Sequence, residues 1–152
     1  MIHALKGVSK PFVLIGDYVP HYKNYYETCR REAGKNVHFL GAVDHASGLL
    51  ASAYAAADTF LLASWLETPG LAALEAALAG AKIVITPEGA TREYFGDYAD
   101  YAAPENLREI RKKVEASLKK SKDHKLQNHV QQNFLWKNVA KKTLEAYERI
   151  LK

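Results

Sequence analysis

Two carboxylates flank the start of an apolar helical pattern in this sequence. Glu67 lies in a short turn, and Glu75 follows eight residues later within a run of alanine and leucine. Between Gly70 and Ala81 no other residue is charged. A carboxylate in apolar surroundings is costly to bury unless a polar group meets it. We therefore expect a polar partner at Glu75, and the nature of that partner is the main indication of function.

The residues after Glu67 predict a helix start that can bind an anion. Thr68 is suited to the N-cap and Pro69 to the first helical position, so the helix is predicted to begin near Pro69. The free N–H groups of Gly70 and Leu71 then lie at the positive end of the helix dipole. Gly70 has no side chain, which lets a ligand approach the backbone closely. Because carboxylates accept hydrogen bonds from hydroxyl groups, a phosphate flanked by hydroxyl-bearing rings would use all of these features.

Other interpretations of the two carboxylates remain open. Glu67 could be a solvated loop residue or could simply favour the helix dipole, and Glu75 could pair with a lysine or arginine of the core. The pair could also be the acids of a glycosidase, although an acid deep in an alanine-rich helix does not suit an open sugar cleft. The spacing alone is a weak signal. Its specificity comes from a strand before it, a Pro-Gly pair within it and the alanine-rich helix after it.

Short apolar runs alternate with helical patterns along the chain. The runs predict strands at residues 12–15, 36–40, 59–63 and 82–86, with at most a short edge strand at 100–103. Helices are expected at residues 2–6, 21–33, 45–57, 69–80, 90–95, 104–118, 124–133 and 136–151. This alternation is typical of an α/β, Rossmann-like three-layer domain with a parallel sheet, here of about five strands covered on both faces. Ligands of such sheets bind beyond the carboxyl ends of the strands.

Length and composition favour one globular domain. The 152 residues are 48% apolar, and we expect residues 1–152 to form a single domain on which the last helix, about 136–151, packs back. The sequence contains no run of 18 apolar residues, so no membrane span is expected. A single cysteine, Cys29, favours a reducing, cytoplasmic setting. The formal charge of +4 suits an anionic ligand or contact with the inner membrane face, but ordinary solubility explains it as well.

Other reactive side chains give weaker signals. The six histidines lack the spacing of a metal site and have no cysteine partners, so no metal is expected. Cys29 lies in a helical pattern and favours a structural role. The tyrosines at 18, 22, 25 and 26 could stack on bases or sugars, but a half-buried helix face is the commoner arrangement. No feature indicates a nucleic-acid partner.

The segment from Ser64 to Thr86 resembles the donor-binding segment of the retaining GT-B glycosyltransferases of group 1. The family pattern is Ser-x-x-Glu-x-x-Gly-Leu-x-x-x-Glu-Ala-x-Ala-x-Gly, followed by a short apolar strand. This sequence matches it at Ser64, Glu67, Gly70, Leu71, Glu75, Ala76 and Gly80 and departs at Leu78. Further similarity covers residues 13–17, 37–41, 54–58 and 134–140, so the resemblance extends over nearly the whole chain.

The resemblance implies roles for individual residues in binding a nucleotide-diphospho-sugar such as a UDP-, GDP- or ADP-hexose. Glu75 would bind the ribose hydroxyls, and Glu67 would contact the transferred sugar as the catalytic candidate. Gly70 and Leu71 would direct their N–H groups at the sugar or diphosphate. Ala42 and Val43 would lie against the base, and Gly16 would let the backbone approach the phosphates. Ser64, Thr68 and Pro69 complete the expected donor site. No cofactor is implied.

Two departures from the family limit the resemblance. Tyr18 stands where the family has glycine, and its ring could narrow the approach to the phosphates. The family also has a central strand, followed by an arginine and a lysine that bind the diphosphate, before the helix that ends here at Gly7. Neither these residues nor the acceptor-binding domain is recognisable in this sequence.

The chain therefore resembles the C-terminal half of the enzyme, with its first central strand missing. We expect the partner to be the N-terminal acceptor domain or a chain supplying it. The isolated chain is then expected not to transfer a hexose, because positioning needs both walls of the cleft. The alternative function is a non-catalytic nucleotide or sugar-nucleotide binding module that acts with a separate partner chain.

Overall fold

Five parallel strands lie in two separate sheets in the computed structural model, which describes residues 1–151. One sheet pairs β1 (Phe12–Ile15) with β2 (Val37–Gly41). The other has the order β3 (Thr59–Leu62), β4 (Lys82–Ile85) and β5 (Asp100–Tyr101). The prediction of an α/β fold with five parallel strands is confirmed. The strands do not form one sheet, however, because β1 and β3 do not pair with each other within the described residues.

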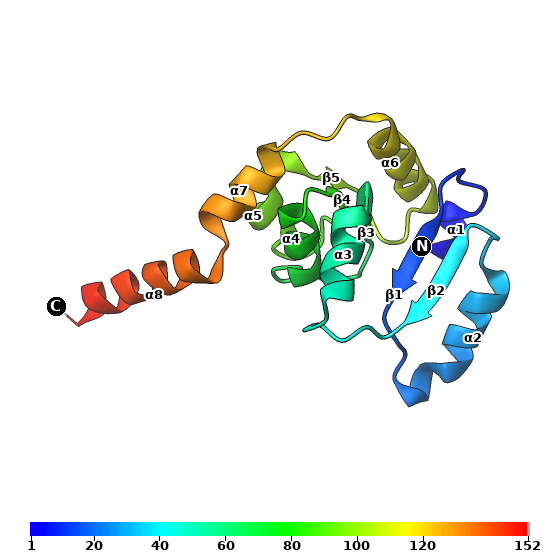
Figure 1. Cartoon of the computed structure of the whole chain (residues 1–152), viewed down its shortest axis with the longest axis horizontal. Coiled ribbons are helices and arrows are strands. Elements are labelled where there is room, and N and C mark those ends of the chain that lie inside the picture. Colours follow the sequence, from blue (N-terminus) through cyan, green and yellow to red (C-terminus); the bar gives the residue numbers. More distant parts are fainter. Residues whose placement is uncertain (152) are drawn as a thin grey trace.

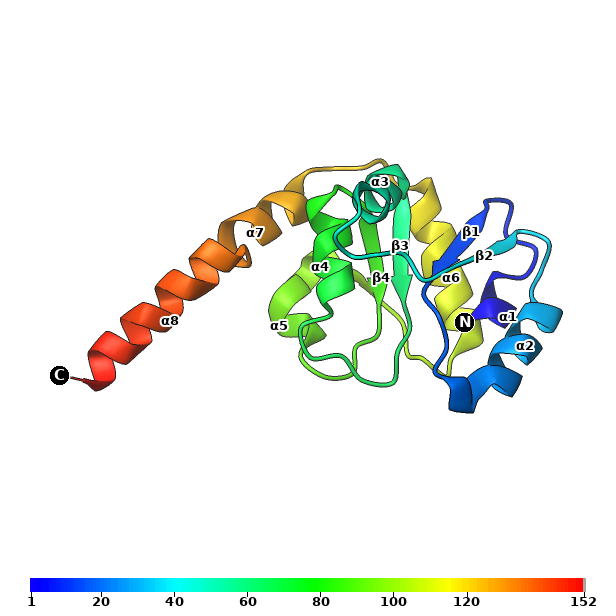
Figure 2. The same cartoon turned by 60° about the horizontal axis from the view of Figure 1, so that its bottom comes forward.

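Helices connect successive strands and cover the larger sheet on both faces. They are α1 (Ile2–Leu5), α2 (Lys23–Glu32), α3 (Gly48–Ala56), α4 (Leu71–Leu78), α5 (Thr91–Phe95), α6 (Leu107–Lys119), α7 (Lys125–Asn133) and α8 (Trp136–Ile150), with short 3-10 turns η1 (Pro20–Tyr22) and η2 (Gly96–Tyr98). Figure 2 shows α4 and α6 on opposite sides of β3 and β4. None of these helices is long and apolar enough to cross a bilayer.

The core is organised around β4, whose side chains alternate between two apolar clusters. Ile83 and Ile85 face the cluster that includes the alanines of α4, Phe95 of α5 and the apolar residues of α7. Val84 faces the opposite cluster, formed with α1 and α6. Successive side chains of a strand point to opposite faces, so a strand buried on both faces reads as a continuous apolar run.

The two-stranded sheet is covered on one face only. Phe12 packs into the cluster with α1 and α6, and Phe39 meets Tyr26 of α2 edge to face at 5.7 Å. On the other face Val13 is 48% exposed and Leu40 is 60% exposed. The expectation that the first strands are covered on both faces is therefore wrong, because the helices that pack on this sheet share one side of it.

The last helix does not pack back on the domain. In Figure 1, α8 extends away from the body of the chain. Among the elements of residues 1–151, its only substantial contact is with α7. Its apolar residues remain outside, with Trp136 79% exposed and Ile150 79% exposed. The amphipathic pattern predicted the helix correctly, but not its position, because within the described residues no apolar surface meets that face.

Candidate functional site

The turn after β3 holds the Glu67 carboxylate in a defined position. The Ser64 hydroxyl donates to Glu67 Oε1 at 2.5 Å. The Glu67 backbone is bonded to the turn after β4, because Glu67 N–H donates to the Glu88 carbonyl at 3.3 Å and Ala90 N–H donates to the Glu67 carbonyl at 3.0 Å. Gly89 lies against this backbone with φ +90°, and a Cβ there would stand 2.0 Å from the Glu67 carbonyl oxygen.

The helix beside Glu67 begins at Leu71, two residues later than expected. Its N-cap is Gly70, in the left-handed conformation at φ 64° and ψ 57°, and not Thr68. Thr68 is exposed and Pro69 precedes the helix, so both predicted capping roles are wrong. The reason is that the left-handed backbone of Gly70 does not fit within a right-handed helix, so the helix begins only after it. The Gly70 carbonyl accepts the first helical bonds, from Ala73 at 2.9 Å and Leu74 at 3.1 Å.

The start of α4 offers backbone donors next to a carboxylate. The first N–H groups of a helix have no acceptor within the helix, and no side chain caps α4. A Cβ built on Gly70 would lie 3.8 Å from Glu67 Oε2, which places the carboxylate beside the helix start. The Leu71 side chain is 53% exposed, so this end of the helix is open to solvent. An anion and a hydroxyl group can therefore be bound side by side here.

Glu75 has a polar partner, as its apolar neighbours in the sequence led us to expect. His45 Nε2 lies 2.9 Å from Glu75 Oε1, and the Glu75 side chain is 38% exposed. The phenol of Tyr54 lies near the Glu75 carboxylate. Burial, and then the negative charge of Glu75, raise the pKa of Tyr54 to about 12. The expectation of a polar partner is confirmed, but the partner is neither lysine nor arginine, and Glu75 is at the surface rather than deep in the helix packing.

The residues predicted from the first two strands lie on the smaller sheet. Gly16 follows β1 with φ 143°, and its N–H donates to the Gly41 carbonyl at 2.9 Å. Ala42 and Val43 follow β2 in the loop that leads to His45 and α3. The Tyr18 ring stacks on Tyr26 of α2, with ring centres 4.6 Å apart, so the aromatic group that departs from the family pattern is held on α2.

The structure thus brings the predicted residues together in three groups. Ser64, Glu67 and Gly70 form the first, and Glu75 forms the second with two residues that are not in the prediction, His45 and Tyr54. Gly16, Ala42 and Val43 form the third, at the carboxyl ends of β1 and β2. Sequence reasoning weighed His45 only as a metal ligand. The available signal was its position shortly after a predicted strand, at the same edge of the sheet as the other candidates.

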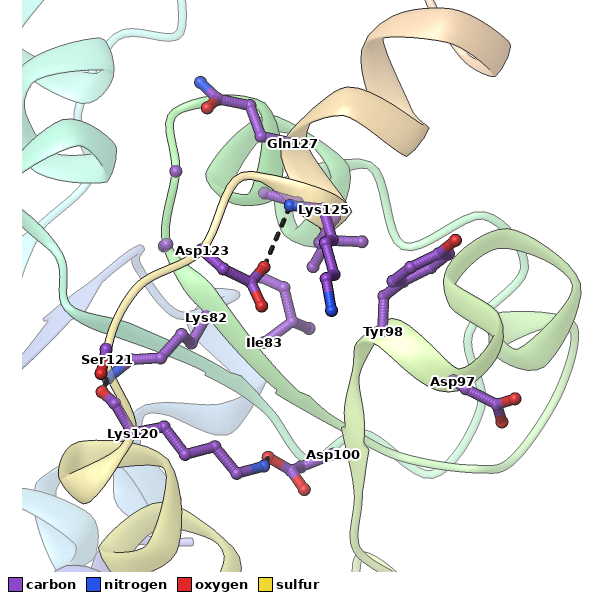
Figure 3. Close-up of a pocket in the computed structure, with 14 residues that line it drawn as sticks. Lys82, Ile83, Asp97, Tyr98, Asp100, Lys120, Ser121, Asp123, Lys125 and Gln127 are labelled. Carbon is purple, nitrogen blue, oxygen red and sulfur yellow. Dashed lines mark hydrogen bonds and ion pairs between the residues drawn. The ribbon is translucent and has the colours of Figure 1, made fainter.

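A cavity of about 480 Å³ lies at the other end of the larger sheet and contains no predicted site residue. It opens beside Lys82, the first residue of β4, and Figure 3 shows the Lys125 side chain directed into it near Tyr98. Its charges are largely engaged already. Lys120 Nζ lies 2.6 Å from Asp100 Oδ2, and Lys82 Nζ donates to the Ser117 carbonyl at 2.6 Å. Within residues 1–151 no three histidine, cysteine or acidic side chains gather as a metal site.

The fold and the position of the candidate site together indicate a class of protein domain. A parallel α/β domain with its candidate site beyond the carboxyl ends of the strands is the arrangement of nucleotide-binding domains. The family model described as "Glycosyl transferases group 1" matches residues 1–120. The chain belongs to the group 1 glycosyltransferase family. No curated protein shows significant sequence similarity to it.

Several solved structures share the fold. Sucrose-phosphate synthase from Thermosynechococcus elongatus superposes with a TM-score of 0.84 at 21% identity, over 99% of this chain and 41% of its own. A glycosyltransferase from Rickettsia africae gives 0.83 at 18% identity, over 99% and 43%. HepE from Anabaena, solved with UDP and glucose, gives 0.79 at 18% identity, over 97% and 43%. The chain therefore spans less than half the length of these proteins.

Proposed function

We propose that this chain is the donor-binding, C-terminal half of a retaining GT-B glycosyltransferase. It binds a nucleotide-diphospho-sugar, such as a UDP-, GDP- or ADP-hexose, without a cofactor. The observation that carries the proposal is the Glu67 carboxylate, held by Ser64 beside the uncapped start of α4. The family and the UDP and glucose bound by the structurally similar HepE support it.

The helix start accounts for the binding of the diphosphate. The N–H groups of Gly70 and Leu71 bind its oxygens, and the same dipole stabilises the negative charge that develops on the leaving diphosphate. Glu67 accepts hydrogen bonds from hydroxyl groups of the hexose. This orients the anomeric carbon, and the negative charge of the carboxylate favours the positive charge that develops there. Glu67 is therefore the catalytic candidate of this chain.

Glu75 binds the ribose through its carboxylate oxygens. One oxygen contacts His45 in the free chain, and the His45 side chain is 79% exposed and free of packing that would prevent its rotation toward solvent when ribose binds. Gly16, Ala42 and Val43 complete the site from the smaller sheet, with Gly16 near the phosphates and the other two near the base. The acceptor half is supplied by an N-terminal domain or by a partner chain, and this chain does not transfer sugar without it.

Calorimetric titration with nucleoside diphosphates and their sugars tests these roles. Glu75→Ala removes hydrogen bonds to a charged acceptor, so it should weaken binding of the free diphosphate by about ten- to a hundredfold. Glu67→Ala should leave that affinity within about twofold and abolish the added affinity for the sugar. The exposed Glu105→Ala is the control and should change neither. Equal losses of diphosphate affinity in the two site variants would contradict the assigned roles.

Transfer is tested by supplying the acceptor half. The 152-residue chain alone should bind donor without turnover, and a complex or fusion with the acceptor domain should transfer the sugar with retention of anomeric configuration. Robust turnover by the chain alone would contradict the half-enzyme assignment. Donor binding with no transfer in the completed protein would instead identify a non-catalytic binding module.

A further inference from the structure

Tyr18 belongs to a column of three aromatic rings beside the smaller sheet. Its ring stacks on Tyr26 of α2, with the ring centres 4.6 Å apart and an angle of 27° between the planes. Tyr26 in turn meets Phe39 of β2 edge to face at 5.7 Å, and the central guanidinium carbon of Arg30 lies 5.9 Å from the centre of each of these two rings. Stacked and edge-to-face ring pairs are favourable, and a cation near a ring adds to them. The column therefore holds the Tyr18 ring in a defined position.

The loop after β1 places this ring at the end of the sheet where the candidate site lies. Tyr18 comes two residues after Gly16, whose N–H donates to the Gly41 carbonyl at 2.9 Å, so the loops after β1 and β2 begin side by side. Both loops leave the carboxyl ends of parallel strands, one toward α2 and the other toward α3 (Figure 1). Ligands of parallel α/β sheets bind beyond this end of the strands. Tyr18 therefore lies where a ligand is expected.

The Tyr18 ring does not obstruct the backbone at Gly16. Apart from the adjoining residues of the chain, no atom of residues 1–151 lies within 4 Å of an ideal Cβ built on Gly16. The ring is instead drawn toward α2 by its stacking on Tyr26. The backbone that is expected near the phosphates is therefore accessible, and the aromatic group lies to one side of it.

The column of rings ends at Tyr18. Tyr26 covers one face of the Tyr18 ring, and no second aromatic ring of residues 1–151 packs on it. Tyr18 is only partly buried. A planar ligand group can therefore extend the column. Among the parts of a nucleotide, only the base has the π face that such stacking requires, and every base has one.

We propose that Tyr18 binds the nucleobase of the donor by stacking, so that the base becomes the fourth planar group of the column. This inference rests on the proposed donor-binding function and adds a residue that holds the base. It does not follow from the family pattern, which has glycine where this chain has Tyr18. Stacking accepts any base, and it is strongest for the purines, because their two fused rings overlap more of the tyrosine ring.

Calorimetric titration with two ligands that differ only in the base tests this role. The ligands are ADP and ribose 5-diphosphate, which has the same ribose and phosphates but no base. Tyr18→Leu keeps an apolar side chain on Tyr26 and removes the ring, so it should weaken ADP binding by about five- to a hundredfold. It should leave the affinity for ribose 5-diphosphate within about twofold. A residue that only supports the fold of the loop would affect both ligands equally.

Matched variants and a measurement on the unchanged chain complete the test. Tyr18→Phe keeps the ring and should bind both ligands within about twofold of the unchanged chain. Tyr25→Leu removes a ring that is 72% exposed on the same helix as Tyr26, and it should change neither affinity. In proton NMR spectra of the unchanged chain, ADP should shift the Tyr18 ring signals upfield, because the ring current of a stacked base shields protons above its face. Ribose 5-diphosphate should not shift them, and this comparison does not depend on the folding of any variant.

The outcomes separate failure of this inference from failure of the proposed function. If the unchanged chain binds none of UDP, GDP and ADP, the donor-binding function is refuted and the stacking role with it. If nucleotides bind but Tyr18→Leu binds ADP as the unchanged chain does, only the stacking role is refuted. Equal losses of affinity for ADP and ribose 5-diphosphate, or an absence of upfield shifts with ADP, would also overturn the stacking role while the donor-binding function stands.

Discussion

The contact of Gly89 with Glu67 gives the sharpest test of how the fold positions the candidate catalytic carboxylate. Gly89→Ala places a Cβ 2.0 Å from the Glu67 carbonyl oxygen in a backbone with φ +90°. A side chain at such a φ costs about 1–2 kcal/mol by itself. The Cβ must also displace the Glu67 backbone, which breaks its bonds to Glu88 and Ala90, each contributing about 0.5–1.5 kcal/mol. The expected total loss of unfolding free energy is about 2–5 kcal/mol.

Gly80→Ala is the matched control for this substitution. Gly80 has the same φ of +90°, and nothing lies within 4 Å of its ideal Cβ. Its loss of stability should therefore be about 1–2 kcal/mol, the conformational cost alone. Urea denaturation followed by circular dichroism measures both variants, and the difference between them is the contribution of the contact with Glu67.

Binding experiments complete the test. Because Gly89→Ala displaces Glu67, it should remove the added affinity for the sugar, as Glu67→Ala does, while Gly80→Ala should keep it. The reasoning is refuted if Gly89→Ala is no more destabilising than Gly80→Ala and binds nucleotide-sugars as the unchanged chain does. That result would show that the turn after β4 does not hold Glu67 in place.

Three further predictions follow from single contacts. Lys82→Met should lower the free energy of unfolding by about 2–3 kcal/mol in urea titrations, because Lys82 is only 15% exposed and donates to the Ser117 and Lys120 carbonyls and to Asp58. The control Lys141→Met, at an exposed position, should change it by less than about 0.5 kcal/mol. The raised pKa of Tyr54 means that the folded state keeps the phenol proton to higher pH than the unfolded state does. The free energy of unfolding should therefore keep its full value below about pH 10 and decrease between about pH 10 and pH 12. Tyr54→Phe should not show this loss in denaturation curves at successive pH values, and parallel curves for the two proteins would contradict the assignment. Removal of the chain from Trp136 onward should change the unfolding free energy by less than about 1 kcal/mol, because α8 contacts little besides α7, and a larger loss would show packing on the domain.

The sequence by itself determined the elements and the chemistry available to them. The strands β1 to β4 could be predicted because each contains a short apolar run, and the helices because their periodicity is local. The expectation of a polar partner at Glu75 also came from composition, since its neighbours in the chain are alanine and leucine. Burying an unpaired carboxylate is costly whatever its partner is, so a partner could be predicted from the apolar neighbours of Glu75 before that partner was known.

Only the tertiary structure decided which groups meet. His45 and Glu75 are 30 residues apart, and no local pattern relates them. The helix start moved from Thr68 to Gly70 because the left-handed backbone at Gly70, beside Ile85 and Glu67, is set by packing against other segments. Local propensity predicted a cap by residue type, but a cap also needs the right backbone conformation.

The arrangement of the sheets was likewise beyond the sequence. An apolar run predicts a strand, but the edge on which it pairs depends on which other strand lies within hydrogen-bond reach. For that reason the five expected strands form two sheets, and the expected packing of α8 on the domain is absent from the described residues. An amphipathic helix face or a strand edge in the sequence indicates that a packing or hydrogen-bond partner is needed. Only the folded structure shows whether another segment of the same chain is that partner.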